Sequence, residues 1–545
     1  MSWLSEAQQS AIAARGVVLV SAGAGSGKTT MLVERAAREV ENGVDPESIF
    51  VVTFTERAAS ELAERMRARL QSVGLQERAE RVSVSTIHGL CGSILREHAF
   101  ALGLDPEFRV LDEASAGIIR GEALEQALTE AAESDGGATL DLLAAFGGGP
   151  LRQLIVRLRD RRLSCGLDLA PPPPPVVDLT GARSALAEVA ERAVAHYAAG
   201  EPSANGERAE RLVALLPAAT AETLVDLSAF DLKRAPAALA AYREQLVLTE
   251  NAARAEVART LHPRVVDLVQ RFDRVYASRK SAAAALDFAD LELRARDLLL
   301  GDDDARASVQ ARVRHLLVDE FQDTNALQDS ILDLIAGDEA ERVYVGDERQ
   351  SIYRFRDADV DVFRRRRDEA ETVVRLDDCF RSSDALIGTL NEIFGRVFDD
   401  GFQRLIARGS APSPEDGVAL ELLVVDEVGG IGAAREREAI ALAARLAELR
   451  EQGHPQSQMV VLLRASTDAD LYEAALQQAG FETHRTIGGG YYGRQQVSDL
   501  CAYLRLLRSR YDDRALLTVL ASPLIGVSNP GLYALRRAAQ TALFR

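Results

Sequence analysis

The segment from Ala22 to Thr29, AGAGSGKT, constrains the fold more than any other part of the chain. It follows a short apolar run, "GVVLVS", and precedes a stretch with helical character, "TTMLVERAAREVEN". Glycines let backbone N–H groups approach phosphate oxygens closely, and the N-terminus of the following helix attracts the same anion. A strand, this loop, Gly-Lys-Thr and a helix in that order predict a nucleotide-binding P-loop.

Within this loop, Lys28 is expected to reach the β and γ phosphates and Thr29 to hold Mg²⁺. Ala22 stands where the first glycine is usual, and a tight turn accommodates it if φ stays negative there. The predicted phosphate-binding residues are Ala22, Gly23, Ala24, Gly25, Ser26, Gly27, Lys28, Thr29 and Thr30.

A second acidic element completes such a site. Asp319 and Glu320 follow the apolar residues Leu-Leu-Val in "HLLVDEFQDT", which places them at the carboxyl end of a buried strand. Asp319 is predicted to hold the metal through water, and Glu320 to orient or deprotonate the attacking water. The long separation between Lys28 and Asp319 indicates an insertion and disfavours a small nucleotide kinase.

Short Val/Ile/Leu-rich runs alternate with amphipathic helical stretches, which predicts a parallel sheet with helices on both faces. Residues 101–285 depart from this rhythm, because they are rich in Ala, Arg and Glu and contain the proline run 171–175. A second α/β series is predicted to begin at "TVVRLDD" and to continue through "VALELLVV", "QMVVLLRA" and "FETHRTIG".

The expected fold is therefore α/β, with a P-loop (RecA-like) sheet domain that carries a helical insertion and is followed by a second, incomplete RecA-like domain. The expected parts are 1–100 with 286–371 (first ATPase domain), 101–285 (helical accessory DNA-binding insertion), 372–496 (partial second domain) and 497–545 (start of a second helical accessory domain).

The formal net charge of −19 disfavours a nucleic-acid partner when it is taken by itself, but it does not exclude a local basic channel. The four cysteines are far apart and form no CxxC pair, and the N-terminus has no signal-peptide pattern. No apolar run is long enough to span a bilayer. We therefore expect a cytoplasmic protein with no membrane partner.

Several segments occur together in the order of one known family. They are "LSEAQ" (4–8), "AGAGSGKT" (22–29), "VTFTERAASEL" (52–62), "STIHGLC" (85–91), "LDFADL" (286–291), "LLVDEFQDTN" (316–325), "VYVGDERQSIYRFRDADV" (343–360) and "LDDCFRSSDALI" (376–387). With them, the chain resembles the UvrD/Rep branch of superfamily 1 helicases. The segment "HAFALGLDPEFRVLDEASA" (98–116) is similar to the RecB/AddA type in particular.

The resemblance implies a motor that binds ATP and Mg²⁺ between two RecA-like domains and moves 3′ to 5′ on single-stranded DNA, in repair or recombination. It implies that Gln8 reads adenine, that Phe380 stacks on it, and that Gln350 senses the γ-phosphate and couples it to DNA. It makes Arg381 an arginine finger supplied from the second domain. Cys379 departs from the family, which usually has asparagine there. Implied partners are single-stranded DNA, its junctions with duplex, and a second helicase/nuclease subunit.

On the DNA side, base stacking suits a motor that must pass every base. The aromatic candidates are Phe54, Tyr353 and Phe355, and the polar ones are Thr55, Thr86, His88 and Arg356. Core packing is the alternative for each aromatic taken singly. Two arginine-rich stretches, 151–163 and 364–367, are better explained as solvated helix faces.

The family's motif V (Thr-His-Lys-Gly-Leu-Glu type) and motif VI (Tyr-Val-Ala-Thr-Arg type) are not found after residue 387, and neither is a nuclease domain. We therefore expect a fragment of a longer helicase or a naturally shortened form, which binds ATP–Mg²⁺ but hydrolyses it poorly by itself. The alternative is an ATP- and DNA-binding module that does not translocate without a partner chain. A metabolite kinase would need an acceptor site, and nothing resembles one.

Overall fold

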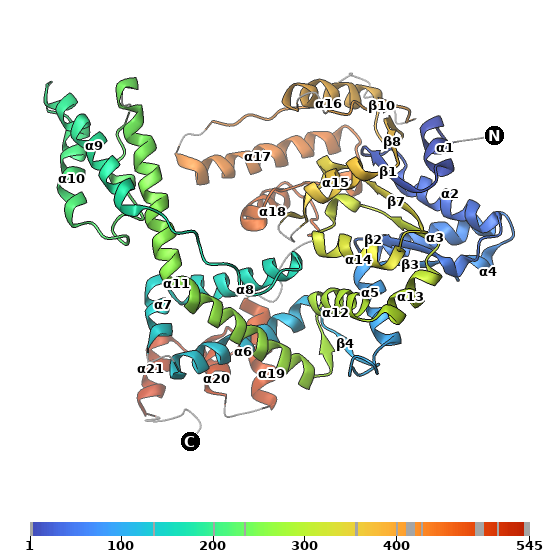
Figure 1. Cartoon of the computed structure of the whole chain (residues 1–545), viewed down its shortest axis with the longest axis horizontal. Helices are drawn as coiled ribbons and strands as arrows, with labels where there is room; N and C mark the ends of the chain where they lie inside the picture. The colour runs from blue at the N-terminus through green and yellow to red at the C-terminus, as the bar shows by residue number, and fades with distance from the viewer. Residues whose placement is uncertain are drawn as a thin grey trace. The chain divides into compact units, whose positions relative to one another are not determined.

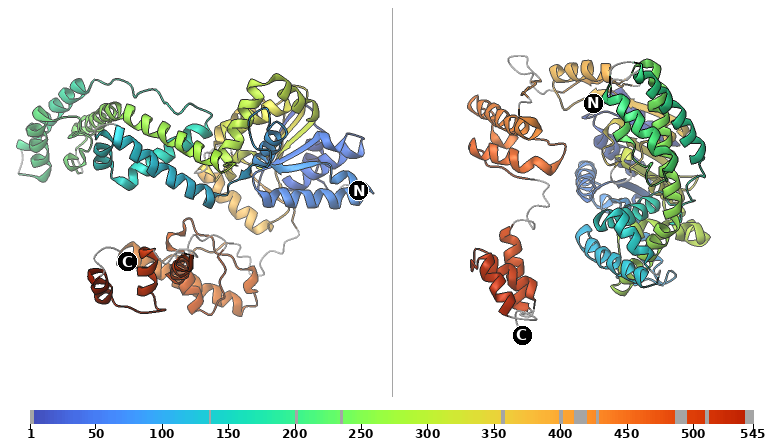
Figure 2. Two further views of the ribbon diagram at one scale, coloured as in Figure 1. Left: turned by 90° about the horizontal axis from the view of Figure 1, so that it is seen from below. Right: turned by 90° about the vertical axis from the view of Figure 1, so that its left-hand side faces the viewer.

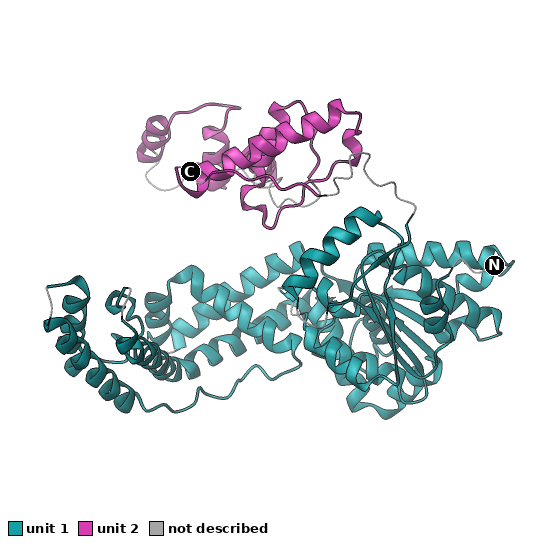
Figure 3. Ribbon diagram, turned by 90° about the horizontal axis from the view of Figure 1, so that it is seen from above, with its two compact units in different colours: residues 1–419 teal, residues 420–545 magenta. Residues whose placement is uncertain are grey.

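The structure is a computed structural model that describes residues 4–134, 137–199, 202–233, 236–354, 358–398, 402–409, 420–426, 429–485, 495–508 and 512–538. The chain divides into two compact units, residues 1–419 and 420–545 (Figure 3). Within the described residues, none of the helices combines the length and the apolar character needed to cross a membrane.

A six-stranded sheet forms the centre of the first unit, with the order β3-β2-β6-β7-β1-β8. Its strands are β1 (Val17–Ala22), β2 (Ile49–Thr53), β3 (Ser83–Thr86), β6 (His315–Val318), β7 (Glu341–Gly346) and β8 (Thr372–Leu376). Every neighbouring pair is parallel. The segments that follow these strands therefore all leave the sheet at the same edge, where ligands of open parallel sheets bind.

Successive strand residues face two different hydrophobic cores. Val18 and Val20 pack into one core, with α1 (Glu6–Ala13), α2 (Lys28–Glu41) and α3 (Glu56–Gln71). Leu19 packs into the other. That second core also contains side chains of α5 (Ile87–Glu97), α12 (Phe288–Gly301), α13 (Asp303–Arg312), α14 (Ala326–Ala336) and α15 (Val360–Glu369). Because both faces are covered, the strands appear in the sequence as continuous apolar runs.

The described residues between β4 (Arg109–Val110) and β5 (Ala285–Leu286), two strands that pair in parallel, are mostly helical. The helices are α6 (Glu113–Ser134), α7 (Ala138–Phe146), α8 (Gly148–Ser164), α9 (Leu179–Ala198), α10 (Ala204–Leu215) and α11 (Ala240–Ala282). The long α11 packs against α9 toward its start and against α6 and α8 toward its end, so it joins two separate small cores (Figures 1 and 2). The predicted α/β class with a helical insertion is confirmed.

One strand lies in a different place from the prediction. "TVVRLDD" was expected to open the second α/β series, but its residues 372–376 form β8, which pairs in parallel with β1 at the edge of the first sheet. An apolar run predicts a strand, but it does not say which backbone the strand will pair with. The first sheet therefore extends to residue 376.

The regular structure among the described residues of the second unit is helical. Its helices are α17 (Gly430–Glu451), α18 (Ala469–Gln478), α19 (Gln495–Arg508), α20 (Asp513–Ala521) and α21 (Asn529–Ala538). The described parts of the three further predicted strands, 420–425, 458–465 and 481–485, contain no strand. Leu422 and Leu462 are 86% and 89% exposed. These segments have the side chains of strands, but no neighbouring backbone among the described residues forms a ladder with them.

Candidate functional site

The predicted P-loop joins β1 to α2. Ala22 ends β1, is fully buried and is not among the described residues with positive φ, as its alanine requires. Gly27 precedes α2 with φ 79°, in the left-handed region that favours glycine. A Cβ on Gly27 would lie 2.6 Å from Gln8 Nε2, so the close approach also requires glycine. The Ser26 hydroxyl donates to the Gly23 carbonyl at 2.8 Å and closes the loop.

The lysine of the loop meets the predicted general base. Lys28 Nζ lies 3.1 Å from Glu320 Oε2, although the two residues are far apart in the sequence. Glu320 has φ 51°, and Ala284 is the only other non-glycine residue with positive φ in the described part of the chain. Such a backbone conformation costs about 1–3 kcal/mol and is concentrated at functional sites. The structure thus brings Lys28 and Glu320 together at the carboxyl edge of the sheet.

The neighbouring carboxyl group suits a cation. Asp319 is buried at the end of β6, and burial, followed by the negative charge of Glu320, raises its pKa to about 6. A cation beside this group would favour its charged form and offset that penalty. Thr29 and Thr30 occupy the first turn of α2, directly after Lys28. Carboxylate and hydroxyl oxygens are the ligands that Mg²⁺ accepts, so Asp319 and Thr29 fit the implied metal.

A hydrogen-bond chain runs from Glu320 to the segment after β7. Gln322 donates through Nε2 to Glu320 Oε2 at 2.8 Å, and its Oε1 accepts from the Asp347 backbone N–H at 3.0 Å. Asp347 in turn accepts from Gln350 Nε2 at 2.8 Å. Gln322 is buried, and a Cβ on Gly346 would lie 2.4 Å from its Oε1, so glycine makes room for the amide. The predicted base and the predicted γ-phosphate sensor are therefore connected.

A second carboxyl group lies close to Glu320. Asp323 belongs to the same short helical turn, and burial, followed by the charge of Glu320, raises its pKa to about 7. Its carboxyl accepts a hydrogen bond from the backbone of Ile352, next to Tyr353. Asp323 thus joins the segment after β6 to the segment after β7 at a second point.

The predicted adenine-reading residue, Gln8, lies against the loop. Gln8 Nε2 donates to the Ser26 carbonyl at 2.9 Å, and its Oε1 accepts from the Ser5 N–H at 3.0 Å. An amide group has two donor and two acceptor positions, so the contacts with described residues leave one of each for another partner.

Phe380 and Arg381 also lie beside the P-loop. The Phe380 N–H donates to the Gly25 carbonyl at 2.8 Å, and a Cβ on Gly25 would lie 2.7 Å from Arg381 Cβ. Both side chains are exposed, whereas Cys379 is buried. The sequence interpretation has Arg381 come from a second domain. In the structure it belongs to the same compact unit as the P-loop.

The DNA-contact candidates gather after β2, β3 and β7. The rings of Phe54 and Tyr353 lie 5.0 Å apart. Thr55 and Thr86 both accept N–H bonds that begin helices, from Ala58 and Gly89, and the Thr86 hydroxyl also donates to Glu56. Both hydroxyl groups are therefore already engaged in hydrogen bonds that stabilise helix N-termini. Phe355 and Arg356 lie outside the described residues.

His88 lies beside Phe288, an aromatic residue that was not predicted from the sequence. Its Nε2 lies 2.9 Å from Glu292 Oε1, and its ring lies 4.7 Å from that of Phe288. Phe288 is 42% exposed, although it begins a helix that packs against α5 and α14. The sequence "LDFADL" could have indicated this residue. In it, Phe288 lies between Asp287 and Asp290, which form the N-terminal cap of the helix.

The interpretation of the two arginine-rich stretches is wrong for one residue in each. Arg366 is buried and binds Asp329 Oδ1 at 2.6 Å and Asp333 Oδ2 at 2.8 Å. Arg159 is also buried and binds Asp273 Oδ1 at 2.7 Å. Helical spacing turns one arginine of each run inward, and a buried guanidinium requires carboxylate partners that lie elsewhere in the sequence.

Comparison with known protein families shows the family to which the chain belongs. Residues 4–371 match the UvrD/REP helicase N-terminal domain. The chain belongs to the UvrD/REP helicase family. Residues 374–544 match the UvrD-like helicase C-terminal domain, which follows directly.

Among curated relatives, the chain is similar to proteins named as subunits of an ATP-dependent helicase/nuclease. It is 28% identical to that of Moorella thermoacetica, with 98% of this chain and 51% of the relative covered. The protein of Desulforudis audaxviator is 29% identical, with 96% and 53% covered, and that of Geobacillus kaustophilus 28%, with 96% and 52%. The chain thus spans about half the length of these relatives.

Proposed function

We propose that this chain forms the ATP-hydrolysing motor portion of a DNA helicase that moves 3′ to 5′ on single-stranded DNA. Its substrates are single strands and their junctions with duplex, its process is repair or recombination, and a second helicase/nuclease subunit is its partner. The observation that carries the proposal is the hydrogen-bond chain from Lys28 through Glu320 and Gln322 to Asp347 and Gln350. It ends in the segment that carries Tyr353, one of the two rings proposed to stack on bases.

In this proposal each group has one task. Lys28 binds the β and γ phosphates, and Glu320 takes the proton of the attacking water. Thr29 and Asp319 hold Mg²⁺, which supplies charge neutralisation to the phosphates when it is bound. Gln350 and Arg381 contact the γ-phosphate, and Gln8 and Phe380 hold adenine.

On the nucleic-acid face, Phe54 and Tyr353 stack on bases, and Phe288 beside His88 extends that surface. Stacking is independent of base identity, as a translocating motor requires. Thr55 and Thr86 place the loops that carry these groups.

The test is ATP hydrolysis by the chain with and without oligothymidylate. We expect turnover that is slow for the chain by itself, rises with DNA and disappears in Lys28→Ala, whose DNA affinity without nucleotide stays as in the wild type. DNA binding without any stimulation of hydrolysis would favour the alternative, a module that binds ATP and DNA but does not translocate. Release of streptavidin from the 5′ end of a strand, and not from the 3′ end, tests the polarity.

A further inference from the structure

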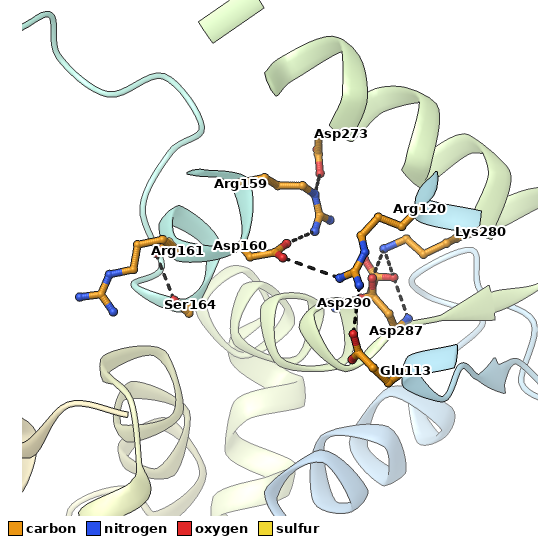
Figure 4. Close-up of polar contacts among 10 residues, drawn as sticks. All are labelled: Glu113, Arg120, Arg159, Asp160, Arg161, Ser164, Asp273, Lys280, Asp287 and Asp290. Atoms are coloured by element: carbon orange, nitrogen blue, oxygen red, sulfur yellow. Dashed lines mark hydrogen bonds and ion pairs between the residues drawn. The ribbon is translucent and has the colours of Figure 1, made fainter. Parts of the chain in front are cut away.

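A cluster of buried charges lies where the helical insertion returns to the sheet domain (Figure 4). Lys280, near the end of α11, is buried, and its Nζ lies 2.9 Å from Asp287 Oδ2 and 2.6 Å from Asp290 Oδ2. The two carboxylates lie at the start of α12. The last turn of the insertion therefore binds the first turn of the helix that follows it, and the proposed function gives these three side chains no task.

Other groups complete the cluster. Asp287 also accepts a hydrogen bond from the Tyr276 hydroxyl, and Lys280 Nζ lies 4.2 Å from the centre of the Tyr276 ring. The Arg159 guanidinium lies 5.0 Å from the same ring and binds Asp273 Oδ1 at 2.7 Å. Burial by itself would raise the pKa of Asp287, but the charge of Lys280 lowers it below its usual value. A buried polar network with this many partners holds its members in one arrangement.

The ion pairs span a strained turn. Ala284 lies between Lys280 and Asp287 and has φ 46°, in the region that favours glycine. A non-glycine residue keeps such a conformation only where the surrounding structure imposes it. The bond between Lys280 and Asp287 closes the chain around this turn. The end of α11 and the start of α12 are thus held in a fixed relation.

The two carboxylates also form the cap of α12. Asp287 Oδ1 accepts from the Asp290 N–H at 2.9 Å, and Asp290 Oδ2 accepts from the Asp287 N–H at 3.0 Å. Phe288 lies between them in the sequence, and its exposed ring is 4.7 Å from that of His88. Because Lys280 binds both members of this capping box, it fixes the helical turn that presents Phe288.

We propose that Lys280 is a positioning residue for Phe288. By binding Asp287 and Asp290, it ties one ring of the proposed nucleic-acid surface to the place of the insertion, without touching DNA itself. Phe288 is then presented to a base only while the end of α11 is seated against α12. The inference rests on the proposed function, and it gives the insertion an indirect part in DNA binding.

The experiment is a double-mutant cycle in which binding of labelled oligothymidylate to the full chain is measured by anisotropy, without nucleotide. Lys280→Met keeps the length of the side chain and removes its charge, so α12 is no longer tied to α11. We expect this variant to bind DNA several-fold more weakly than the wild type, with a loss no larger than that of Phe288→Ala. The variant with both substitutions should bind within about twofold of Phe288→Ala, because Lys280 acts only through this ring.

Two further variants separate positioning from stability. Lys280→Met leaves two buried carboxylates without their cation, so it is also combined with Asp290→Asn, whose amide still accepts the Asp287 N–H. This combination should fold, as melting curves check, and should bind DNA as weakly as Lys280→Met. The control is Arg35→Met, which removes a buried cation that lies 3.4 Å from Glu341 at the start of β7. It should lower the melting temperature and leave the DNA affinity unchanged.

The proposal is overturned if Lys280→Met, alone and with Asp290→Asn, binds oligothymidylate as tightly as Arg35→Met while Phe288→Ala binds more weakly. The cluster would then serve stability only, and the proposed function would stand. The proposal also fails if Lys280→Met weakens binding by the same factor with and without Phe288→Ala. If Phe288→Ala binds as tightly as the wild type, the role of Phe288 in the proposed function fails, and this inference fails with it.

Discussion

The proposed nucleotide site and the proposed nucleic-acid face are built differently. Around the P-loop, Lys28, Glu320 and Gln322 are joined by hydrogen bonds within a partly or fully buried setting. On the proposed nucleic-acid face, Phe288 is exposed and Phe54 and Tyr353 are half-buried, and no hydrogen-bond chain among the described residues joins Phe288 to the other two rings. We therefore expect that a single substitution in the nucleotide site abolishes ATP hydrolysis. A single substitution on the proposed nucleic-acid face should lower the DNA affinity only in part.

The largest effect is expected for Glu320→Gln. The amide keeps the shape but cannot take a proton, so ATP hydrolysis should fall by about 10²–10⁴-fold. Binding of a fluorescent ATP analogue should stay within a few-fold of the wild type. Steady-state turnover combined with equilibrium binding measures both quantities. If turnover fell by less than about tenfold, Glu320 would not be the general base for the attacking water.

A smaller effect is expected for Phe54→Ala and Phe288→Ala. Stacking on one base contributes about 1–3 kcal/mol, so each variant should bind oligothymidylate about 5- to 150-fold more weakly. Basal ATP hydrolysis without DNA should not change. Val176→Ala, at a side chain 82% exposed on the insertion, is the control. Equal affinities of Phe54→Ala and the control would mean that this ring packs against Tyr353 without binding bases.

The smallest effect is on stability. The pKa of Asp323 is raised to about 7, above its unfolded value of about 4, so the folded state favours the neutral acid. Its contribution to stability is complete below about pH 4 and is lost as the pH rises through about 7. Asp323→Asn keeps an acceptor for the Ile352 N–H and does not titrate. It should raise the free energy of unfolding by about 1–3 kcal/mol at pH 8, and by much less at pH 5.

Urea unfolding at the two pH values measures this difference. A gain that is equal at pH 5 and pH 8 would show that charge on Asp323 is not its cause.

The sequence allowed the P-loop and the pair Asp319 and Glu320 to be predicted because strand, turn and polar residues lie within ten residues of one another. The link through Gln322 could not be predicted, because it depends on where the end of β7 lies relative to β6. The inward turn of Arg159 and Arg366 was missed for the same reason, since their partners are remote in the sequence.

The strands of the second series show another limit. Their apolar residues are evident in "QMVVLLRA", but a strand also requires a neighbour, and periodicity does not identify one. The assignment of β8 to the first sheet, beside β1, makes the same point.

The central claim is that Gln322 couples the nucleotide site to the nucleic-acid face. The most direct measurement is the affinity for oligothymidylate with and without a non-hydrolysable ATP analogue, in the wild type and in Gln322→Ala. We predict that the analogue changes the wild-type affinity by about 5- to 150-fold, the usual range of coupling between sites. In Gln322→Ala this change should disappear, while each ligand by itself binds as in the wild type. An undiminished change in Gln322→Ala, or none in the wild type, would contradict the claim.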